Sequence, residues 1–351
     1  MEIINPTKLV LELLGDISLR HREVLSKRYG LLNGERRTLE DVGNDYSITR
    51  ERVRQIEEAG FKYLMKLDRT KELKDVFDLF YSHIKSHGDL RHEDKLLIDD
   101  LAKIFNLDAH DKNLMATVYF ILTLGDSFNR FPQTEKYHSA WTIDKKSFAK
   151  AKTIIDQVVT MLEKRKEVVK EIELLEMMEI AARKHLKIVD EKILRSYLDL
   201  SKDITSNIYN EYGLKDWPEI NPHSMKDRAY IILKKEKRPL HFLEITDLIN
   251  KSGISAKEVH QATVHNDLIR DNRFVLCGRG LYALKEWGYE EGTIKDILIN
   301  MFKKNSQSKT KEEIIKYVLS KRQVKPGTVV LNLQDKKIFK RLEDGRYAPK
   351  K

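Results

Sequence analysis

Residues 38–64 read as a short helix, a tight turn and a second helix, and no other stretch constrains the fold as strongly. The first helix is expected over 39–45, where Gly43 is small enough for a neighbouring helix to approach closely. Residues 46–48 form the turn, and Thr49 supplies the hydroxyl that favours a helix N-cap. The pattern predicts a helix-turn-helix.

The second helix of this stretch has two distinct faces. At about 100° per residue, one side is apolar and carries Val53, Ile56, Gly60 and Leu64. The opposite side carries Arg50, Glu51, Arg54, Gln55 and Glu58. Arg50 and Arg54 can donate in a fork to guanine, while Gln55 can pair with adenine and Glu51 can accept from cytosine. These four residues are the predicted base contacts of a recognition helix.

Residues 19–67 resemble the fourth conserved region of bacterial primary sigma factors. The motifs R-E-V-L-x-x-R-Y-G, T-L-E-x-V-G and T-R-E-R-V-R-Q-I-E occur in the order and spacing of that family. The resemblance implies a helical module that binds the upstream promoter hexamer and the flap of the RNA polymerase β subunit. It also assigns base contacts to Arg50, Glu51, Arg54 and Gln55. The implied phosphate contacts are Thr49, Leu39 and Glu40, with Arg28 and Arg37 as secondary candidates.

Two departures limit the resemblance. After the recognition helix the family has a basic ending, whereas this chain continues G-F-K-Y-L-M-K-L over 60–67, so the usual activator contacts are not expected. The chain also lacks an aromatic- and basic-rich helix similar to the sigma segment that melts promoters. The resemblance covers about the first fifth of the 351 residues, so a complete sigma factor is not predicted.

The middle of the chain is expected to be helical and contains no catalytic motif. Residues 96–105 and 114–124 suggest helices, and 128–143 suggest a hairpin, which together give the order of a winged helix. Residues 147–185 lack Pro and Gly and predict one long helix, either packed on its own chain or forming a coiled-coil arm. Further helices are expected at 189–198 and 201–209.

Residues 222–288 predict a winged helix, with helices over 225–234, 243–252 and 257–269 and two strands around Gly278-Arg279-Gly280. The segments R-A-Y-I-I-L-K-K-E-K-R-P-L-H-F-L-E-I-T-D-L-I-N and F-V-L-C-G-R-G-L-Y-A-L resemble the HARE-HTH family, which includes the delta subunit of some bacterial RNA polymerases. This resemblance implies association with nucleic acid or polymerase, without catalysis. Helix and wing position suggest DNA contacts by Lys257, His260, His265 and Arg279.

The last segment repeats the helix–helix–helix–hairpin order, with helices expected over 294–302, 311–320 and 326–335. Residues 222–351 carry 28 basic and 16 acidic side chains, an excess that suits a polyanion partner. A basic wing able to grip phosphates is predicted from Lys336, Lys337, Lys340, Arg341 and Arg346. The alternative is a lysine-rich surface on a protein-docking winged helix.

Several other functions are disfavoured by the sequence. Cys277 is the single cysteine, which excludes intrachain disulfides and cysteine-built zinc sites. No apolar run approaches the roughly 20 residues that cross a bilayer, and no signal peptide is recognised, so a cytoplasmic, nucleoid-associated bacterial protein is expected. No P-loop, nucleophile elbow or H-E-x-x-H occurs. His83, His87 and His92 are expected to be surface or core histidines. We predict no enzyme, no cofactor, no metal site and no small-molecule substrate.

We therefore predict a mainly α chain of tandem helix-turn-helix and winged-helix modules with short β-hairpin wings. The expected domains are a sigma-like helix-turn-helix, a helical or winged-helix domain, a long helix with a small module, a HARE-HTH-like winged helix and a basic winged helix, at 1–72, 73–146, 147–221, 222–288 and 289–351. The predicted function is a sequence-specific, sigma-like accessory transcription factor that binds double-stranded DNA and RNA polymerase. One alternative is a regulator that binds the polymerase flap without reading DNA. Another is a DNA-targeting subunit of a restriction-type complex.

Overall fold

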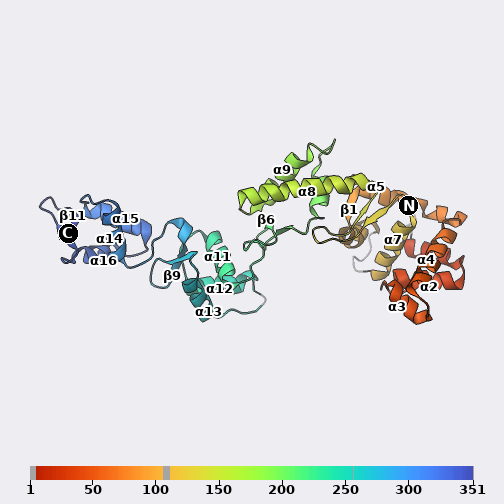
Figure 1. Cartoon of the computed structure of the whole chain (residues 1–351), viewed down its shortest axis with the longest axis horizontal. Helices are drawn as coiled ribbons and strands as arrows, with labels where there is room; N and C mark the ends of the chain where they lie inside the picture. Colours follow the sequence, from red (N-terminus) through yellow and green to blue (C-terminus); the bar gives the residue numbers. More distant parts are fainter. Residues whose placement is uncertain (1–4, 106–110, 256, 351) are drawn as a thin grey trace. The chain divides into compact units, whose positions relative to one another are not determined.

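The computed structural model describes residues 5–105, 111–255 and 257–350 (Figure 1). The chain divides into two units, Met1–Thr205 with Tyr212–Lys215 and Ser206–Glu211 with Asp216–Lys351, and each is treated by itself. Helices dominate both units, and the strands form small antiparallel hairpins and three-stranded sheets. The predicted mainly α class is confirmed. No described helix is both long enough and apolar enough to cross a membrane.

The N-terminal module has four helices, α1 (Pro6–Gly15), α2 (Leu19–Tyr29), α3 (Leu39–Tyr46) and α4 (Arg50–Leu64). Helix α3 starts in a capping box made by Thr38 and Asp41, and α4 starts where the Thr49 hydroxyl accepts from the Arg52 amide at 3.2 Å. A Cβ at position 43 would lie 2.7 Å from the Ile48 carbonyl oxygen, so Gly43 allows the turn to fold back on α3.

A first winged helix follows the short helical turn η1 (Asp68–Leu73). Its three helical segments are α5, then η2 with α6, then α7, and its sheet has the strand order β1-β3-β2. The bounds are α5 (Lys74–Ser86), β1 (Leu90–His92), η2 (Lys95–Asp100), α6 (Leu101–Phe105), α7 (Lys112–Leu124), β2 (Asn129–Phe131) and β3 (Ala140–Thr142). The hairpin expected within 128–143 is present, and β1 joins it as a third strand.

A second winged helix has the same plan, with strand order β4-β6-β5. Its elements are α8 (Lys145–Arg165), β4 (Val169–Lys170), α9 (Glu171–Ala182), α10 (Glu191–Leu198), β5 (Ile204–Ser206) and β6 (Glu211–Leu214). The prediction of one helix over 147–185 is wrong, because α8 ends at Lys166, which has a left-handed φ of 56° and donates its amide to Leu162.

The helix predicted over 201–209 is also wrong, since this stretch contains β5 and the turn that leads to β6. Short polar side chains bind the backbone here and replace helical hydrogen bonds. The Ser201 hydroxyl accepts from the Asp203 and Ile204 amides at 3.2 and 3.1 Å. The Asn207 side chain accepts from the Tyr209 and Glu211 amides at 2.9 and 3.1 Å, which sets the turn.

Two more winged helices complete the chain. The third consists of α11 (Met225–Glu236), β7 (Leu240–His241), α12 (Phe242–Ser252), α13 (Gln261–Arg270), β8 (Phe274–Leu276) and β9 (Leu281–Leu284), followed by the turn η3 (Lys285–Trp287). The fourth consists of α14 (Ile294–Lys304), α15 (Lys311–Lys321), α16 (Pro326–Leu333), β10 (Phe339–Arg341) and β11 (Tyr347–Pro349). Helix α13 starts four residues later than expected, after residues 257–260.

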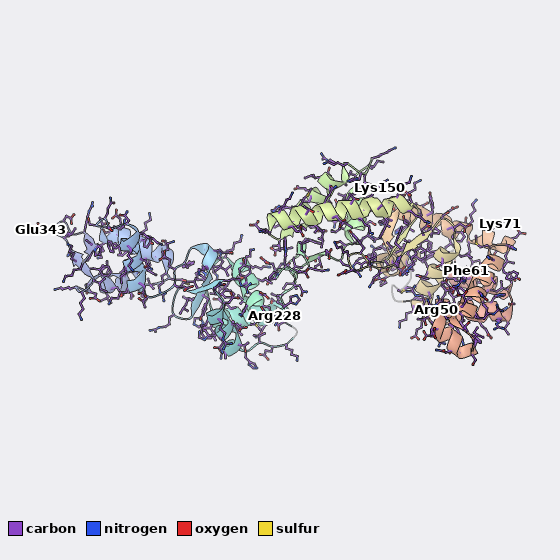
Figure 2. All side chains as sticks on the ribbon, viewed as in Figure 1. Arg50, Phe61, Lys71, Lys150, Arg228 and Glu343 are labelled. Atoms are coloured by element: carbon purple, nitrogen blue, oxygen red, sulfur yellow. The ribbon has the colours of Figure 1, made fainter. Side chains whose placement is uncertain are left out.

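The N-terminal module and the first winged helix share one hydrophobic core. Helix α7 packs on α1 and α2, and its Phe120 ring lies 5.2 Å from the Tyr29 ring of α2. Phe120 also stacks on Phe61 of α4, with ring centroids 5.5 Å apart (Phe61 is labelled in Figure 2). The face of α4 that points away from this core is therefore held in place by the winged helix behind it.

Candidate nucleic-acid interface

Helix α4 has the two faces that its sequence predicts. Val53, Ile56, Gly60 and Leu64 are buried, and Arg50, Glu51, Arg54, Gln55 and Glu58 are exposed. Arg50 opens the helix directly after its Thr49 cap, and it is labelled in Figure 2. The N-terminal turns of α4 thus present donors and acceptors together on an outer surface, which is how a recognition helix meets base edges.

The reading residues of α4 bind one another in the free protein. The Arg54 guanidinium donates to both oxygens of Glu51, at 2.6 and 2.9 Å, and also to Glu58. This hydrogen bonding lowers the pKa of Glu51. Arg52 donates to the side-chain oxygen of Gln55 at 3.1 Å.

These intrahelical bonds are weak enough to exchange. An exposed ion pair is worth about 0.2–1 kcal/mol, whereas a good base contact contributes about 1–3 kcal/mol. When Arg54 turns to a guanine, the Glu51 carboxylate is released and can accept from a cytosine amino group. The free state therefore stores the base-reading groups in pairs that DNA can replace.

The residues expected to contact phosphates fall into two groups. Thr49, Leu39 and Glu40 lie at the starts of α4 and α3. The first amides of a helix have no acceptor within the helix, so the amides of Leu39 and Glu40 can donate to a phosphate. The hydroxyl of Thr49 is exposed but already accepts from Arg52.

Arg28 and Arg37 have internal partners. Arg28 is mostly buried, donates to Glu57 at 3.2 Å and also donates to the Arg37 carbonyl. Arg37 forms a fork with Asp45, and this hydrogen bonding lowers the pKa of Asp45 to about 2. Both arginines therefore brace the approach to α3, and their role in binding phosphate stays a prediction.

The candidates in the third winged helix are scattered. Lys257 and His260 are exposed and precede α13. His265 is half-buried, because its ring stacks on Phe242 at 4.5 Å and meets Tyr282 edge-on at 5.9 Å. Arg279 is exposed at the tip between β8 and β9. The structure does not bring these four residues onto one continuous surface of α13.

A buried polar network that the sequence analysis missed joins the first two winged helices. Arg91 donates to both oxygens of Asp100, at 2.7 and 3.0 Å, and to Asp199 at 2.9 Å. His83 lies 2.9 Å from Asp100. The partners are up to 108 residues apart, so no local pattern announces the network.

His83, His87 and Asp100 also form the group with metal-ligand spacing among the described residues, with ligand atoms within 4.8 Å. Both Asp100 oxygens already accept from the Arg91 guanidinium, and a cation placed there would be repelled by it. The arrangement fits a structural ion-pair network better than a metal site. His87 and His92 are buried and His83 is half-buried.

Two buried histidines should make the first unit sensitive to acid. Burial lowers the pKa of His87 and of His92 to about 4 from 6.5. Between these values the unfolded chain holds the extra protons, so stability is complete above pH 6.5 and is lost as the pH falls toward 4. Each histidine should cost on the order of 1–2 kcal/mol between pH 7.5 and pH 5. Urea unfolding at the two pH values measures the loss.

The variant His92→Phe isolates one of the two groups. Neither ring nitrogen of His92 has a hydrogen-bond partner among the described residues, and the ring packs on His138 at 4.6 Å. Phenylalanine keeps this ring contact and cannot titrate, so the loss on acidification should shrink. The matched control is His260→Phe at an exposed position of the other unit. Equal acid losses in wild type and His92→Phe would contradict the assignment.

Two segments of the chain match known families. Residues 13–66 match the model of Sigma-70, region 4, and residues 223–287 match that of HARE-HTH, the ASXL and restriction endonuclease HTH domain. RNA polymerase sigma factor SigA of Clostridium acetobutylicum is 44% identical over 69 residues, which cover 20% of this chain and 18% of that protein. The chain therefore matches under a fifth of the length of this curated relative. The module that carries α4 is similar to sigma-70 region 4, and the third winged helix is similar to HARE-HTH domains.

Proposed function

We propose that the chain is a sequence-specific DNA-binding protein with a sigma-like accessory role in transcription initiation. One observation carries the proposal: α4 is capped and exposed, and it presents Arg50, Glu51, Arg54 and Gln55 on one outer face. The similarity of residues 13–66 to sigma-70 region 4 supports duplex DNA as the ligand. The major groove of B-form DNA admits such a helix, and each of these side chain types matches a base edge there.

In this proposal α4 enters the major groove with its first two turns. Arg54 exchanges Glu51 and Glu58 for a base, and the freed carboxylate of Glu51 takes a neighbouring amino group. The amides at the start of α3 bind a flanking phosphate and fix the register. The partner in initiation is RNA polymerase, through the flap of its β subunit, and the protein acts in the bacterial cytoplasm at the nucleoid.

A second candidate function is polymerase binding without DNA reading. The observation that favours it is the set of ion pairs that occupy Arg54 in the free protein. If those pairs persist on DNA, α4 offers a nearly neutral surface that suits a protein partner. A selection experiment separates the two functions.

Selection from a random duplex library at physiological salt tests the proposal. Wild type should enrich a short motif, and the double variant Arg54→Ala, Gln55→Ala should lose it, since two base contacts of about 1–3 kcal/mol each disappear. Lys62→Ala is the control, because it removes the same charge from an exposed position later on α4. Enrichment of the same motif by wild type and the double variant, or of none by wild type, would reject base reading by α4.

A further inference from the structure

The four winged helices differ in what covers the third helix, the element that such folds place in a groove. In the first, α7 is buried on the shared core with the N-terminal module. In the second, α10 packs on the first winged helix. There Ser196 donates to the Leu90 carbonyl at 2.7 Å, and Tyr197 donates to the Gly88 carbonyl at 2.9 Å. Neither α7 nor α10 can enter a groove without dismantling these contacts.

The third helix of the third winged helix, α13, is exposed but poorly suited to a polyanion. Its outer surface is made of Gln261, Ala262, Thr263, Asn266, Ile269 and Arg270. Asp267 offsets Arg270, and Glu258 lies just before the helix. The helix therefore has no excess of positive charge with which to hold phosphates.

Helix α16 of the last winged helix is different. Val329 and Leu333 hold it on the core, while Pro326, Gly327, Thr328 and Leu331 are exposed. Residues 322–334 contain no acidic side chain, and Lys325 precedes the first turn. Leu331 is 67% exposed. Small, neutral side chains allow close approach to base edges, and an exposed apolar group can contact a thymine methyl.

Basic side chains follow α16 along the wing. Lys336 and Lys337 come directly after the helix, and Lys340 and Arg341 lie on β10, next to the β10–β11 turn where Glu343 is labelled in Figure 2. All four are exposed, and none forms an ion pair with a described residue. The nearest acidic group, Asp335, is taken by Lys295 at 2.6 Å. Their positive charge is therefore available to an external anion.

We propose that the last winged helix is a second binding site for duplex DNA, with α16 in the major groove and the β10–β11 wing on the adjacent phosphates. This site does not depend on base reading by α4. Because α4 and α16 belong to different units of one chain, a single molecule can hold a duplex at two points, and the second contact gains from its high effective concentration.

The wing is tested in the full-length protein with Lys336→Ala, Lys337→Ala, Lys340→Ala and Arg341→Ala combined. Binding to a 40-bp duplex without the α4 motif is measured by fluorescence anisotropy over a salt series. Each lost phosphate contact should make the slope of log affinity against log salt shallower by about 0.9, so a total change of about 2–4 is expected. The control combines four exposed lysines of the other unit with the same charge change: Lys145→Ala, Lys146→Ala, Lys164→Ala and Lys184→Ala. Equal slopes for the two quadruple variants would overturn the site.

Helix α16 is tested with Thr328→Glu and Leu331→Glu combined, two exposed positions that leave the core intact. Carboxylates facing the groove should weaken binding to the same duplex at least tenfold, and wild-type affinity would overturn the placement of α16. A 40-bp RNA duplex should compete poorly, since the deep A-form major groove excludes a helix; equal competition would overturn the assignment to DNA. The Arg54→Ala, Gln55→Ala variant should keep the wild-type salt slope, so failure at α4 and failure at α16 are distinguishable.

Discussion

Phe120→Ala should lower the free energy of unfolding of the first unit by about 3–5 kcal/mol, the usual cost of removing a buried aromatic ring. The ring is fully buried and touches Tyr29 of α2 and Phe61 of α4. Although Phe120 belongs to the first winged helix, its loss removes support from the helix-turn-helix. Urea denaturation followed by circular dichroism measures the change.

The shared core also predicts how the variant unfolds. The helix-turn-helix and the first winged helix should melt in one transition, and DNA binding through α4 should be lost at the same urea concentration. Ile172→Ala is the control, because that side chain is 72% exposed and its removal should cost little. A Phe120→Ala protein in which α4 still binds DNA after the winged helix has melted would show two independent modules instead.

Local chemistry explains why the candidate site could be predicted from the sequence. The N-cap of α4 is a threonine, its buried face repeats with helical period, and its polar face carries residue types that match base edges. All of this information lies within about 15 consecutive residues. The hairpins around Gly278 and Gly345 were predictable for the same reason, since both tips contain a glycine with positive φ, Gly280 and Gly345.

The rest depends on contacts between distant residues. The first strand of each sheet is two or three residues long, too short for a periodic signal. The end of α8 is set by Lys166, a residue that carries no helix-breaking signature. The burial of α7 reads from sequence only as an apolar helix, since its partners Tyr29 and Phe61 lie in another module. Tertiary context therefore decides which third helices are free, and sequence alone does not.

Arg91→Met should destabilise the first unit by about 3–5 kcal/mol, as expected when one partner of a buried ion pair is removed. Asp100 is 4% exposed and would lose two of its hydrogen bonds. Burial raises the pKa of Asp100, but the hydrogen bonds from His83 and Arg91 lower it more, so it stays ionised in the folded protein. Without the guanidinium, that charge is buried with His83 as its remaining side-chain partner. Thermal and urea unfolding at pH 7 measure the cost.

The pH dependence separates lost charge compensation from a simple packing defect. With Arg91 gone, the folded pKa of Asp100 should rise above its unfolded value, so the folded state takes up a proton first. The extra destabilisation is then greatest at pH 7 and becomes smaller toward pH 4, opposite to the trend produced by His87 and His92. Adding Asp100→Asn and Asp199→Asn to Arg91→Met should restore much of the stability at pH 7, because no uncompensated charge stays buried. A loss that is independent of pH and is not relieved by the two amides would mean that Arg91 acts through packing alone, and that the joint between the first two winged helices does not depend on charge.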